Sequence, residues 1–511
     1  MRIPFPVHIP LWGATGFAAF LFAVQLRQGT SLLFALCCFL FICIATLAFN
    51  LAGGFSRPSG SYVFFYATLC VIVGLCWKAY LGEPADSNLL APQLTIEVFL
   101  GGITAMYGAV FISRRLSSRH GLLQNLVNDN NMQNATVGCM VAGFLISVVL
   151  IGTRTVNGSV LSALVQINRF FPMAIILGVI YAIRRSGGTR SVNLPVLLSA
   201  GAIFIQGILG FSKEGIFTPV LCWAIAAGSQ RYKVSLYQLI GGVAVVALMV
   251  MYLVPYSQYG RNLRFDGWTF SQNVDTSLEL LSNLGDVREK YKESSAGDYT
   301  ENSVQSYYFN TPQGFFDRLH MIAPDDSLID GTERKGPFGL YPIIAGFENL
   351  VPHVFWPNKP AIMFGNIYAR EIGGLPENDY TTGIAFSPSG DAYHIARWVG
   401  VFLIAPILWI GLFTLFDSLC GDTRTSPWGL LIMALFAHTA PEGMLGGVIY
   451  SYGFVTMGLL FAALSAAYVM PIFGTLVKGP EKTRLRRSRL LRGAVRRSQA
   501  AWAGGESSLQ G

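Results

Sequence analysis

Long apolar runs separated by short polar connections fill most of the chain, and one long polar excursion interrupts them. Twelve apolar runs can be distinguished: 9–26, 31–49, 61–81, 97–113, 136–152, 166–183, 195–211, 215–229, 236–255, 397–416, 426–440 and 447–473. Most are close to the about 20 residues that a helix needs to cross a bilayer. Open strands would leave peptide groups unpaired in lipid. The pattern therefore predicts an all-α polytopic membrane protein with about 12 transmembrane helices.

The excursion divides the chain into four parts. Residues 1–255 hold nine predicted spans, and residues 256–396 are expected to form a large outer loop domain with membrane-surface helices between spans nine and ten. Residues 397–473 hold the last three spans, and residues 474–511 form a basic tail. A protein that only crosses the membrane does not need so long a polar segment, whereas one that acts on a substrate at the membrane surface does.

One part of this outer domain, residues 338–356, is apolar enough to suggest a thirteenth span. Pro342, Glu348, Pro352 and His353 argue against that interpretation, because charge and proline are unfavourable in a lipid-exposed helix. We expect a helix or re-entrant element that rests on the outer leaflet.

Composition agrees with a membrane protein. The 511 residues are 52% hydrophobic and 13% charged, with a mean hydropathy of +0.47, whereas soluble proteins carry about 25% charged residues. A second apolar run closely follows the first, so we expect an uncleaved first helix rather than a signal peptide. The eight cysteines show no metal-binding spacing, and none lies in the outer domain.

Lysine and arginine set the expected orientation, because cytoplasmic loops carry an excess of both. With the N-terminus inside, the short inner loops carry the following basic residues: Arg57, Arg114, Arg115, Arg119, Arg184, Arg185, Arg190, Arg231, Lys233 and Arg424. The short outer loops carry only Arg27, Arg154 and Lys213. Residues 478–497 of the tail include nine basic residues and one acid, whereas the excursion has ten basic and eighteen acidic residues, a net charge of −8. Both termini are therefore expected in the cytoplasm, and the excursion outside.

Two cations near predicted span ends are candidates for binding an anionic ligand. Lys213 lies between Gly210 and Gly215, which allow a backbone to approach a bulky ligand, at a point where a helix N-terminus favours an anion. Arg169 falls at the start of the sixth span, where an arginine faces protein, water or an anion. A solvated helix cap for Lys213 and snorkelling to the surface for Arg169 are the alternatives.

Further candidates lie in the outer domain. Lys359 is held between prolines directly after Trp356 and Pro357, which suits a diphosphate, although a simple snorkelling lysine has the same surroundings. Arg318 lies in a short helical patch with His320. The basic tail is best interpreted as an anchor against anionic lipid rather than a nucleic-acid site.

Four titratable groups are candidates for a general base. Glu348 and His353 are the only such groups in the apolar stretch 338–356, and Asp391 and His394 come just before the tenth span. Burial raises the pKa of a carboxylate, and histidine titrates near neutral pH, so either type can accept a proton. An interfacial or structural polar role is the alternative for each.

Several catalytic signatures are absent from the sequence. There is no P-loop, no Gly-x-Ser-x-Gly, no His-Glu-x-x-His and no Asp-x-Asp nucleotide-sugar motif. Neither a metal nor a nucleotide cofactor is implied. Any group that is transferred is therefore expected to be carried by a lipid.

The aromatic and proline-rich stretch of the outer domain resembles a family motif. Residues 352–360 read Pro-His-Val-Phe-Trp-Pro-Asn-Lys-Pro, and residues 365–368 read Gly-Asn-Ile-Tyr. This resembles the outer loop of the bacterial oligosaccharide repeat-unit polymerases (Wzy-type O-antigen and exopolysaccharide polymerases), which commonly reads Pro-Arg-x-x-Trp-Pro-x-Lys-Pro before Gly-Asn and an aromatic residue. His353 stands where the family has arginine.

Two shorter stretches and the overall layout extend the resemblance over the chain. Residues 382–393 are similar to the family's Gly/Ser-rich approach to the next helix, and residues 210–213 are similar to its Gly-x-Ser-Arg/Lys element. About a dozen spans with one long outer loop late in the chain is also the family's layout.

The resemblance implies a GT-C-like glycosyltransferase fold in the bacterial cytoplasmic (inner) membrane. The enzyme would join an undecaprenyl-diphosphate-linked glycan to a lipid-linked repeat unit at the outer face. Such a transfer needs cations for the departing diphosphate and a base for the acceptor hydroxyl. The expected substrate-binding residues are Arg169, Lys213, Arg318, Trp356 and Lys359, and the base is expected among Glu348, His353, Asp391 and His394. The implied partners are glycan donor and acceptor, membrane lipid, and a chain-length regulator and flippase, but not nucleic acid.

Two other functions remain open. An O-antigen ligase performs the same chemistry but transfers glycan to the lipid A core. A lipid-linked oligosaccharide flippase or other secondary transporter is the second alternative, but transporters often show internal repeats and acids near the middle of the bilayer. The chain has no evident repeat and no acid in the middle of a predicted span.

Overall fold

The computed structural model describes residues 1–152, 168–263, 270–297, 307–311, 313–352, 355–356, 359–360, 362–380 and 382–478. Within these ranges the regular elements are helical, apart from one isolated bridge between Arg2 and Lys233. The prediction of an all-helical polytopic fold is confirmed. Each of the twelve predicted apolar runs coincides with a helix wherever it is described.

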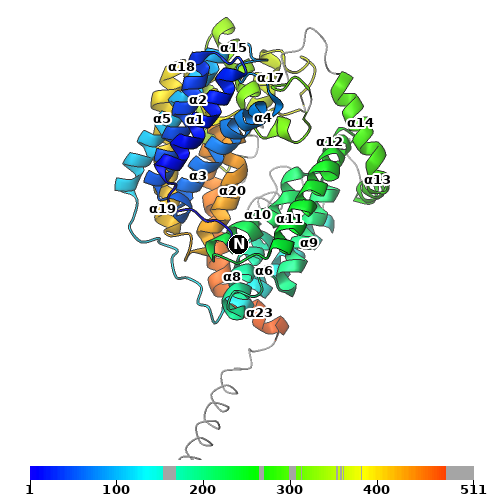
Figure 1. Cartoon of the computed structure of the whole chain (residues 1–511). Coiled ribbons are helices and arrows are strands. Elements are labelled where there is room, and N and C mark those ends of the chain that lie inside the picture. Colours follow the sequence, from blue (N-terminus) through cyan, green and yellow to red (C-terminus); the bar gives the residue numbers. More distant parts are fainter. Residues whose placement is uncertain are drawn as a thin grey trace, which may run out of the picture.

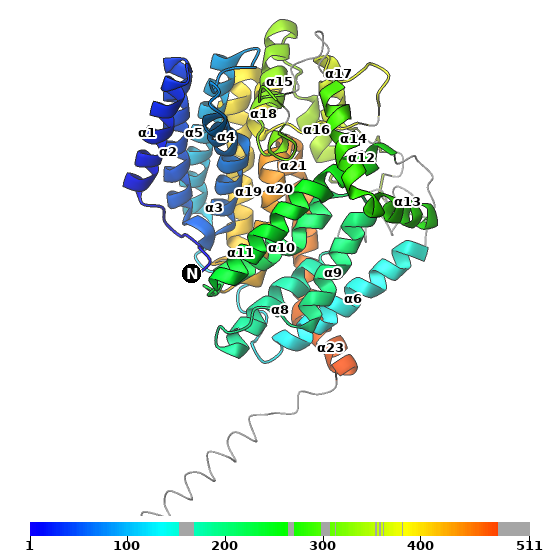
Figure 2. The same ribbon diagram turned by 45° about the vertical axis from the view of Figure 1, so that its right-hand side comes forward.

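Figure 2 shows the first helices side by side, with a second group below them and α10 and α11 between the two groups. The first group is α1 (Leu11–Arg27), α2 (Leu32–Ala52), α3 (Pro58–Ala67), α4 (Val73–Leu81) and α5 (Pro92–Leu116). The second comprises α6 (Met132–Gly152), α8 (Phe170–Ser186) and α9 (Leu194–Leu209), followed by α10 (Lys213–Ser229) and α11 (Leu236–Leu248).

Residues 256–396 are also helical where they are described, and the helices after them pack against both groups. The remaining helices are α12 (Val254–Leu263), α13 (Phe270–Ser282), α14 (Leu284–Gly297), α15 (Ile322–Lys335), α16 (Tyr341–Glu348), α17 (Phe364–Glu371), α18 (Pro388–Val399), α19 (Ala405–Cys420), α20 (Pro427–Glu442), α21 (Met444–Tyr450), α22 (Thr456–Leu464) and α23 (Met470–Lys478). Among the described helices, seven are long and apolar enough to cross a membrane. The helices α1, α8, α9, α10 and α20 have 16 or 17 residues, near the lower limit for a span.

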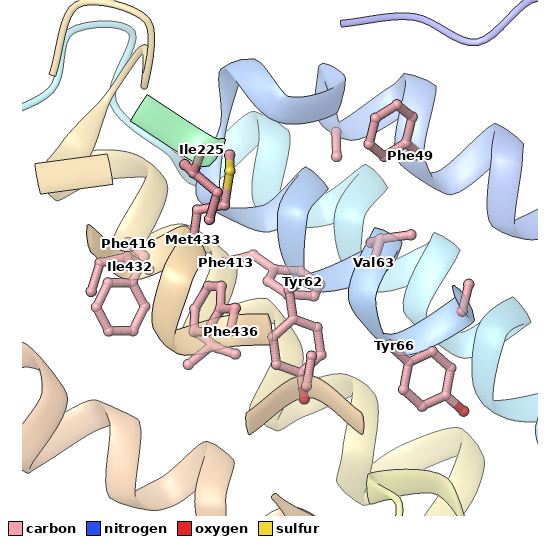
Figure 3. Packing of buried hydrophobic residues seen from close by; sticks show 14 of the residues in the cluster. Phe49, Tyr62, Val63, Tyr66, Ile225, Phe413, Phe416, Ile432, Met433 and Phe436 are labelled. Atoms are coloured by element: carbon pink, nitrogen blue, oxygen red, sulfur yellow. The ribbon is translucent and has the colours of Figure 1, made fainter. Parts of the chain in front are cut away.

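The core packs aromatic side chains between α3, α19 and α20 (Figure 3). The Tyr62 ring meets Phe413 and Phe436 edge-on, with ring centroids 5.5 and 5.2 Å apart. Phe416 also meets Phe436 edge-on at 5.5 Å. Edge-to-face pairs at such distances are favourable beyond their burial, and they join a late helix pair to an early helix.

The predicted inner loops lie on one face of the molecule. The N-terminal ammonium donates to the Val234 carbonyl at 2.8 Å. Arg114 donates to the Leu51 carbonyl at 2.8 Å, and Arg184 forms an ion pair with Asp129 at 2.6 Å. Helices α15, α17 and the start of α18, which belong to the predicted outer domain, lie at the opposite end of the helices (Figure 1).

The helix α18 contains a sharp reversal. Ala396 and Arg397 have non-helical backbone angles, and Arg397 has φ of +49°. A Cβ on Gly400 would lie 1.7 Å from the Ala392 carbonyl oxygen, whereas residues eight apart in a straight helix are about 12 Å apart. Pro388–Ile395 is therefore a short re-entrant helix that folds back on the apolar helix after it.

The expected start and end of the outer domain fall at different kinds of position in the structure. The expected junction at 255/256 lies inside one apolar helical segment, Leu236–Leu263. The expected end at 396 coincides with the reversal in α18. In the apolar stretch 338–356, the described helix α16 has eight residues, which is too short to cross a bilayer.

Candidate functional site

Three cationic side chains from separate elements meet at the end of the helices that the outer domain covers. Lys213 begins α10, Arg261 lies near the end of α12, and Arg318 ends a short 3-10 turn, η4 (Phe316–Arg318). The charges of Arg318 and Arg261 both act on the Lys213 ammonium. We call these three residues the cation cluster. It unites two of the predicted anion-binding residues with Arg261, which was not predicted.

A strained turn positions Lys213. Phe211, two residues earlier, has φ of +49°, a left-handed conformation that is costly for a bulky residue. The helix α12 holds this turn: Ser257 donates to the Phe211 carbonyl at 2.6 Å, and Tyr256 donates to the Ile208 carbonyl at 3.1 Å. Ser212 then caps α10 by accepting from the Gly215 N–H at 3.2 Å. Lys213 is thus fixed at the first helical position.

Aromatic stacking positions Arg318. Phe316 stacks on Trp77 of α4 with ring centroids 3.7 Å apart and planes 6° from parallel. Phe315 stacks on Phe217 of α10 at 5.7 Å, one turn beyond Lys213. The turn η4 is therefore wedged between α4 and α10, which places its arginine beside the start of α10.

The cation cluster has no ion-paired carboxylate among the described residues, and the acids that act on it are Asp317, through Arg318, and Glu442, through Lys213. Burial, and then the charges of Arg318 and Arg261, lower the pKa of Lys213 to about 7. Within the described ranges, no carboxylate lies at ion-pair distance from any of the three side chains. The carboxylate of Glu442 acts on Lys213 in the opposite direction from a greater distance. Cations held together without a counter-ion form a site for a multivalent anion.

A cavity of about 250 Å³ lies beyond Glu442, at the junction of α20 and α21. It is lined by Pro342, Gly346, Asn349, Leu350, Ile362, Phe364, Gly365, Asp391, Gly443, Met444, Gly446, Gly447, Tyr450 and Phe454. We call it the acidic cavity, because Asp391 is the one carboxylate in this lining. Met444, at the wall, has φ of +54°, the second strained position at the site.

Asp391 is buried, with 1% of its surface exposed. One carboxylate oxygen, Oδ2, accepts from the Leu445 N–H at 2.7 Å. The other, Oδ1, has no hydrogen-bond partner among the described residues, although the Tyr368 hydroxyl, itself without a hydrogen-bond partner there, is near enough to interact with it. A buried carboxylate oxygen without a partner is costly, so this oxygen is suited to accepting a hydrogen bond or proton from a ligand.

Asp325, on α15, anchors the re-entrant helix that carries Asp391. It accepts from the Ser387 N–H at 2.9 Å and from the Ser387 hydroxyl, and Gly390 packs directly against its carboxyl group. On the other side, the Ser389 hydroxyl lies 2.5 Å from the Tyr66 hydroxyl of α3. The short helix that carries Asp391 is therefore held by α15 on one side and by α3 on the other.

Arg169, just before α8, lies near the acidic cavity. Its charge acts on the hydroxyl of Tyr450, which lines the cavity. Arg169 also has no ion-pair partner within the part of the chain that the structure describes. Two of the predicted cations, Lys213 and Arg318, thus belong to the cation cluster, and the third, Arg169, lies near the acidic cavity.

The other candidates do not line the cavity. His394 is buried behind it, where its Nδ1 lies 2.8 Å from the Thr332 hydroxyl and its ring packs on Tyr368, the neighbour of Asp391. Glu348 and Trp356 are exposed, and neither lines the cavity. His353 lies outside the described residues.

Lys359 is engaged by its own turn. Its ammonium donates to the Asn349 and Val351 carbonyls, both at 2.8 Å. These carbonyls follow the end of α16, so Lys359 closes the turn that presents Asn349 to the acidic cavity. These two hydrogen bonds give the Lys359 ammonium a structural role, and the predicted diphosphate contact stays a prediction.

Comparison with protein-family models gave no match for this chain, and no curated protein or solved structure matched it significantly. Among the described residues, no group of three or more His, Cys, Asp or Glu side chains is arranged to hold a metal ion.

Replacing Lys359 with alanine is expected to lower the free energy of unfolding by about 1 kcal/mol, because two charge-assisted hydrogen bonds at a largely exposed site are lost. Thermal unfolding in detergent measures this loss, and Lys359→Arg is the control that keeps a donor. A melting temperature that stays at the wild-type value in Lys359→Ala would contradict this structural role.

Asp325 is expected to make stability depend on pH. Burial raises the pKa of its carboxyl group to about 7, from about 3.9 in an unfolded chain. The folded protein therefore holds this proton more tightly, so stability is highest below pH about 4 and falls as the pH rises through about 7. The expected contribution is on the order of 3 kcal/mol. Melting curves from pH 4 to 8 should show a clearly smaller decline for Asp325→Asn than for wild type; equal declines would contradict the assignment.

Proposed function

We propose that this protein is a membrane-embedded glycosyltransferase that polymerises lipid-linked oligosaccharide repeat units into a surface polysaccharide. In this proposal about twelve helices cross the bacterial cytoplasmic membrane, both termini lie in the cytoplasm, and the outer domain faces outward. The donor and acceptor are undecaprenyl-diphosphate-linked glycans. The reaction uses neither a nucleotide nor a metal.

One observation carries the proposal: three cations without an ion-pair partner among the described residues lie near a cavity whose buried carboxylate has one oxygen without a hydrogen-bond partner there. Glycosyl transfer from a lipid diphosphate needs both features. Positive charge stabilises the diphosphate as it departs, and a base removes the proton of the attacking hydroxyl.

The reaction balances as a single transfer. The acceptor hydroxyl oxygen forms the new bond to the anomeric carbon of the donor sugar, and the bond from that carbon to the diphosphate oxygen breaks. The proton of the hydroxyl passes to Asp391 Oδ1. The lipid diphosphate departs with the bonding electron pair, held by Lys213, Arg261 and Arg318, and Arg169 provides a further positive charge at the cavity.

Deletion of the gene followed by gel sizing of surface glycan tests the proposal. Loss of a polymerase leaves single repeat units on the lipid A core, whereas loss of a ligase leaves lipid-linked polymer unattached. A transporter defect removes the repeat units from the outer face. Purified protein in vesicles with lipid-linked repeat units should form polymer in the presence of a metal chelator and without any nucleotide. If a folded wild-type preparation forms no polymer under these conditions, the proposal is refuted.

A further inference from the structure

The acidic cavity contains an aromatic surface as well as a carboxylate. Tyr450 and Phe454 are four residues apart at the start of the last long apolar helix, with ring centroids 5.1 Å apart and planes 27° from parallel. Both rings line the cavity and both are only partly buried. From this geometry we infer that the cavity is the subsite for the terminal sugar ring of the acceptor, with Tyr450 and Phe454 as its stacking platform. This inference rests on the proposed function.

Stacked aromatic rings suit one face of a sugar. A pyranose ring presents C–H groups on its faces and hydroxyl groups around its edge. The aromatic face is negative and attracts C–H groups, while the large ring area excludes water.

The polar groups of the cavity complement the edge of the sugar. Asp391 Oδ1 lacks a hydrogen-bond partner and is buried, so it can accept from a sugar hydroxyl. Asn349, on the turn closed by Lys359, also lines the cavity, and an amide can both donate and accept. A few polar groups placed around an apolar surface are typical of small-molecule sites.

Glycines keep this space open. A Cβ on Gly446 or Gly447 would meet no atom within 4 Å, so a side chain at either position would extend into free volume. The volume of about 250 Å³ lies below the about 300 Å³ at which drug-sized sites begin. The cavity therefore fits one ring, and the acceptor hydroxyl on that ring comes to Asp391.

Binding of a lipid-free repeat-unit oligosaccharide, prepared from the surface polysaccharide of the source bacterium, tests the inference. This probe has no diphosphate, so its affinity reports only on the sugar subsite. The full-length protein in detergent is titrated by calorimetry. Tyr450→Ala and Phe454→Leu should each weaken binding about tenfold, because each variant loses one aromatic ring. Leucine is chosen at position 454 because it keeps an apolar side chain. Gly447→Leu should abolish binding by filling the cavity.

Tyr468→Ala is the matched control, because Tyr468 is an exposed ring on the same segment outside the cavity. Unchanged binding in Phe454→Leu and Tyr450→Ala, both with wild-type melting temperatures, would overturn the inference even if the protein polymerises. The two proposals can also be told apart. If the wild-type protein binds the oligosaccharide but makes no polymer, and these variants lose binding, the sugar subsite is supported and the proposed function is refuted.

Discussion

Lys213→Met should reduce polymer formation by about 100- to 1000-fold, the usual effect of removing one donor that stabilises a developing negative charge. Methionine keeps the length of the side chain, so the capped start of α10 and the packing against α12 are retained. The measurement is the rate of chain extension by purified protein in vesicles. Lys213→Arg should retain most of the activity, because its charge is permanent.

The pH profile gives this prediction a second, independent measurement. Because the pKa of Lys213 is lowered to about 7, its ammonium is charged below that pH and loses its proton above it. The rate constant kcat/KM, which reports free enzyme, should therefore fall above pH about 7 in the wild type. In Lys213→Arg this decline should disappear, because arginine stays protonated.

The matched control is Arg27→Met, which removes an exposed outer-loop cation remote in sequence from the cluster. It should leave both the rate and the pH profile unchanged. A near-normal polymer length in Lys213→Met would exclude Lys213 from diphosphate binding. A decline above pH 7 that persists in Lys213→Arg would assign that titration to another group.

The fold class could be predicted from the sequence because run length is a local property. Each apolar run needed only its own residues to be recognised, and each coincides with a helix where described. The course of the chain at Pro255 is less local. Proline normally ends a helix, but here a π-helical turn, Met249–Leu253, precedes Pro255 and the helix runs on to Leu263.

The site could be predicted only in part. Lys213 and Arg318 were recognised as unusual cations, but Arg261 was hidden because the sequence placed it beyond the end of its helix. The prolines beside Lys359 predict a fixed side chain, yet they do not say where its ammonium points, and it points to main-chain carbonyls. The contact between Asp391 and Leu445 joins residues 54 apart in sequence, which no local pattern encodes.

Asp391→Asn should lower kcat/KM by about 100- to 10,000-fold, the range expected for loss of a general base. The amide oxygen of asparagine can still accept from the Leu445 N–H, which holds the carboxylate in the wild type. The fold and the shape of the acidic cavity should therefore persist, while the atom that takes the proton is lost. Steady-state chain extension and a melting curve on the same preparation measure the two effects.

Two further variants separate the chemistry from the structure. Asp391→Glu restores a carboxylate on a longer side chain and should recover part of the activity. Asp330→Asn, which removes an acid paired with Arg334 at 2.7 Å on α15, should leave activity unchanged, because surface ion pairs contribute little. If Asp391→Asn extends chains at the wild-type rate while Lys213→Met does not, the diphosphate site stands and the proton must go to a different base. If Asp391→Asn is inactive, melts like wild type and still binds the lipid-free oligosaccharide, then the carboxylate acts in the chemical step, because both the fold and the sugar contacts survive its loss.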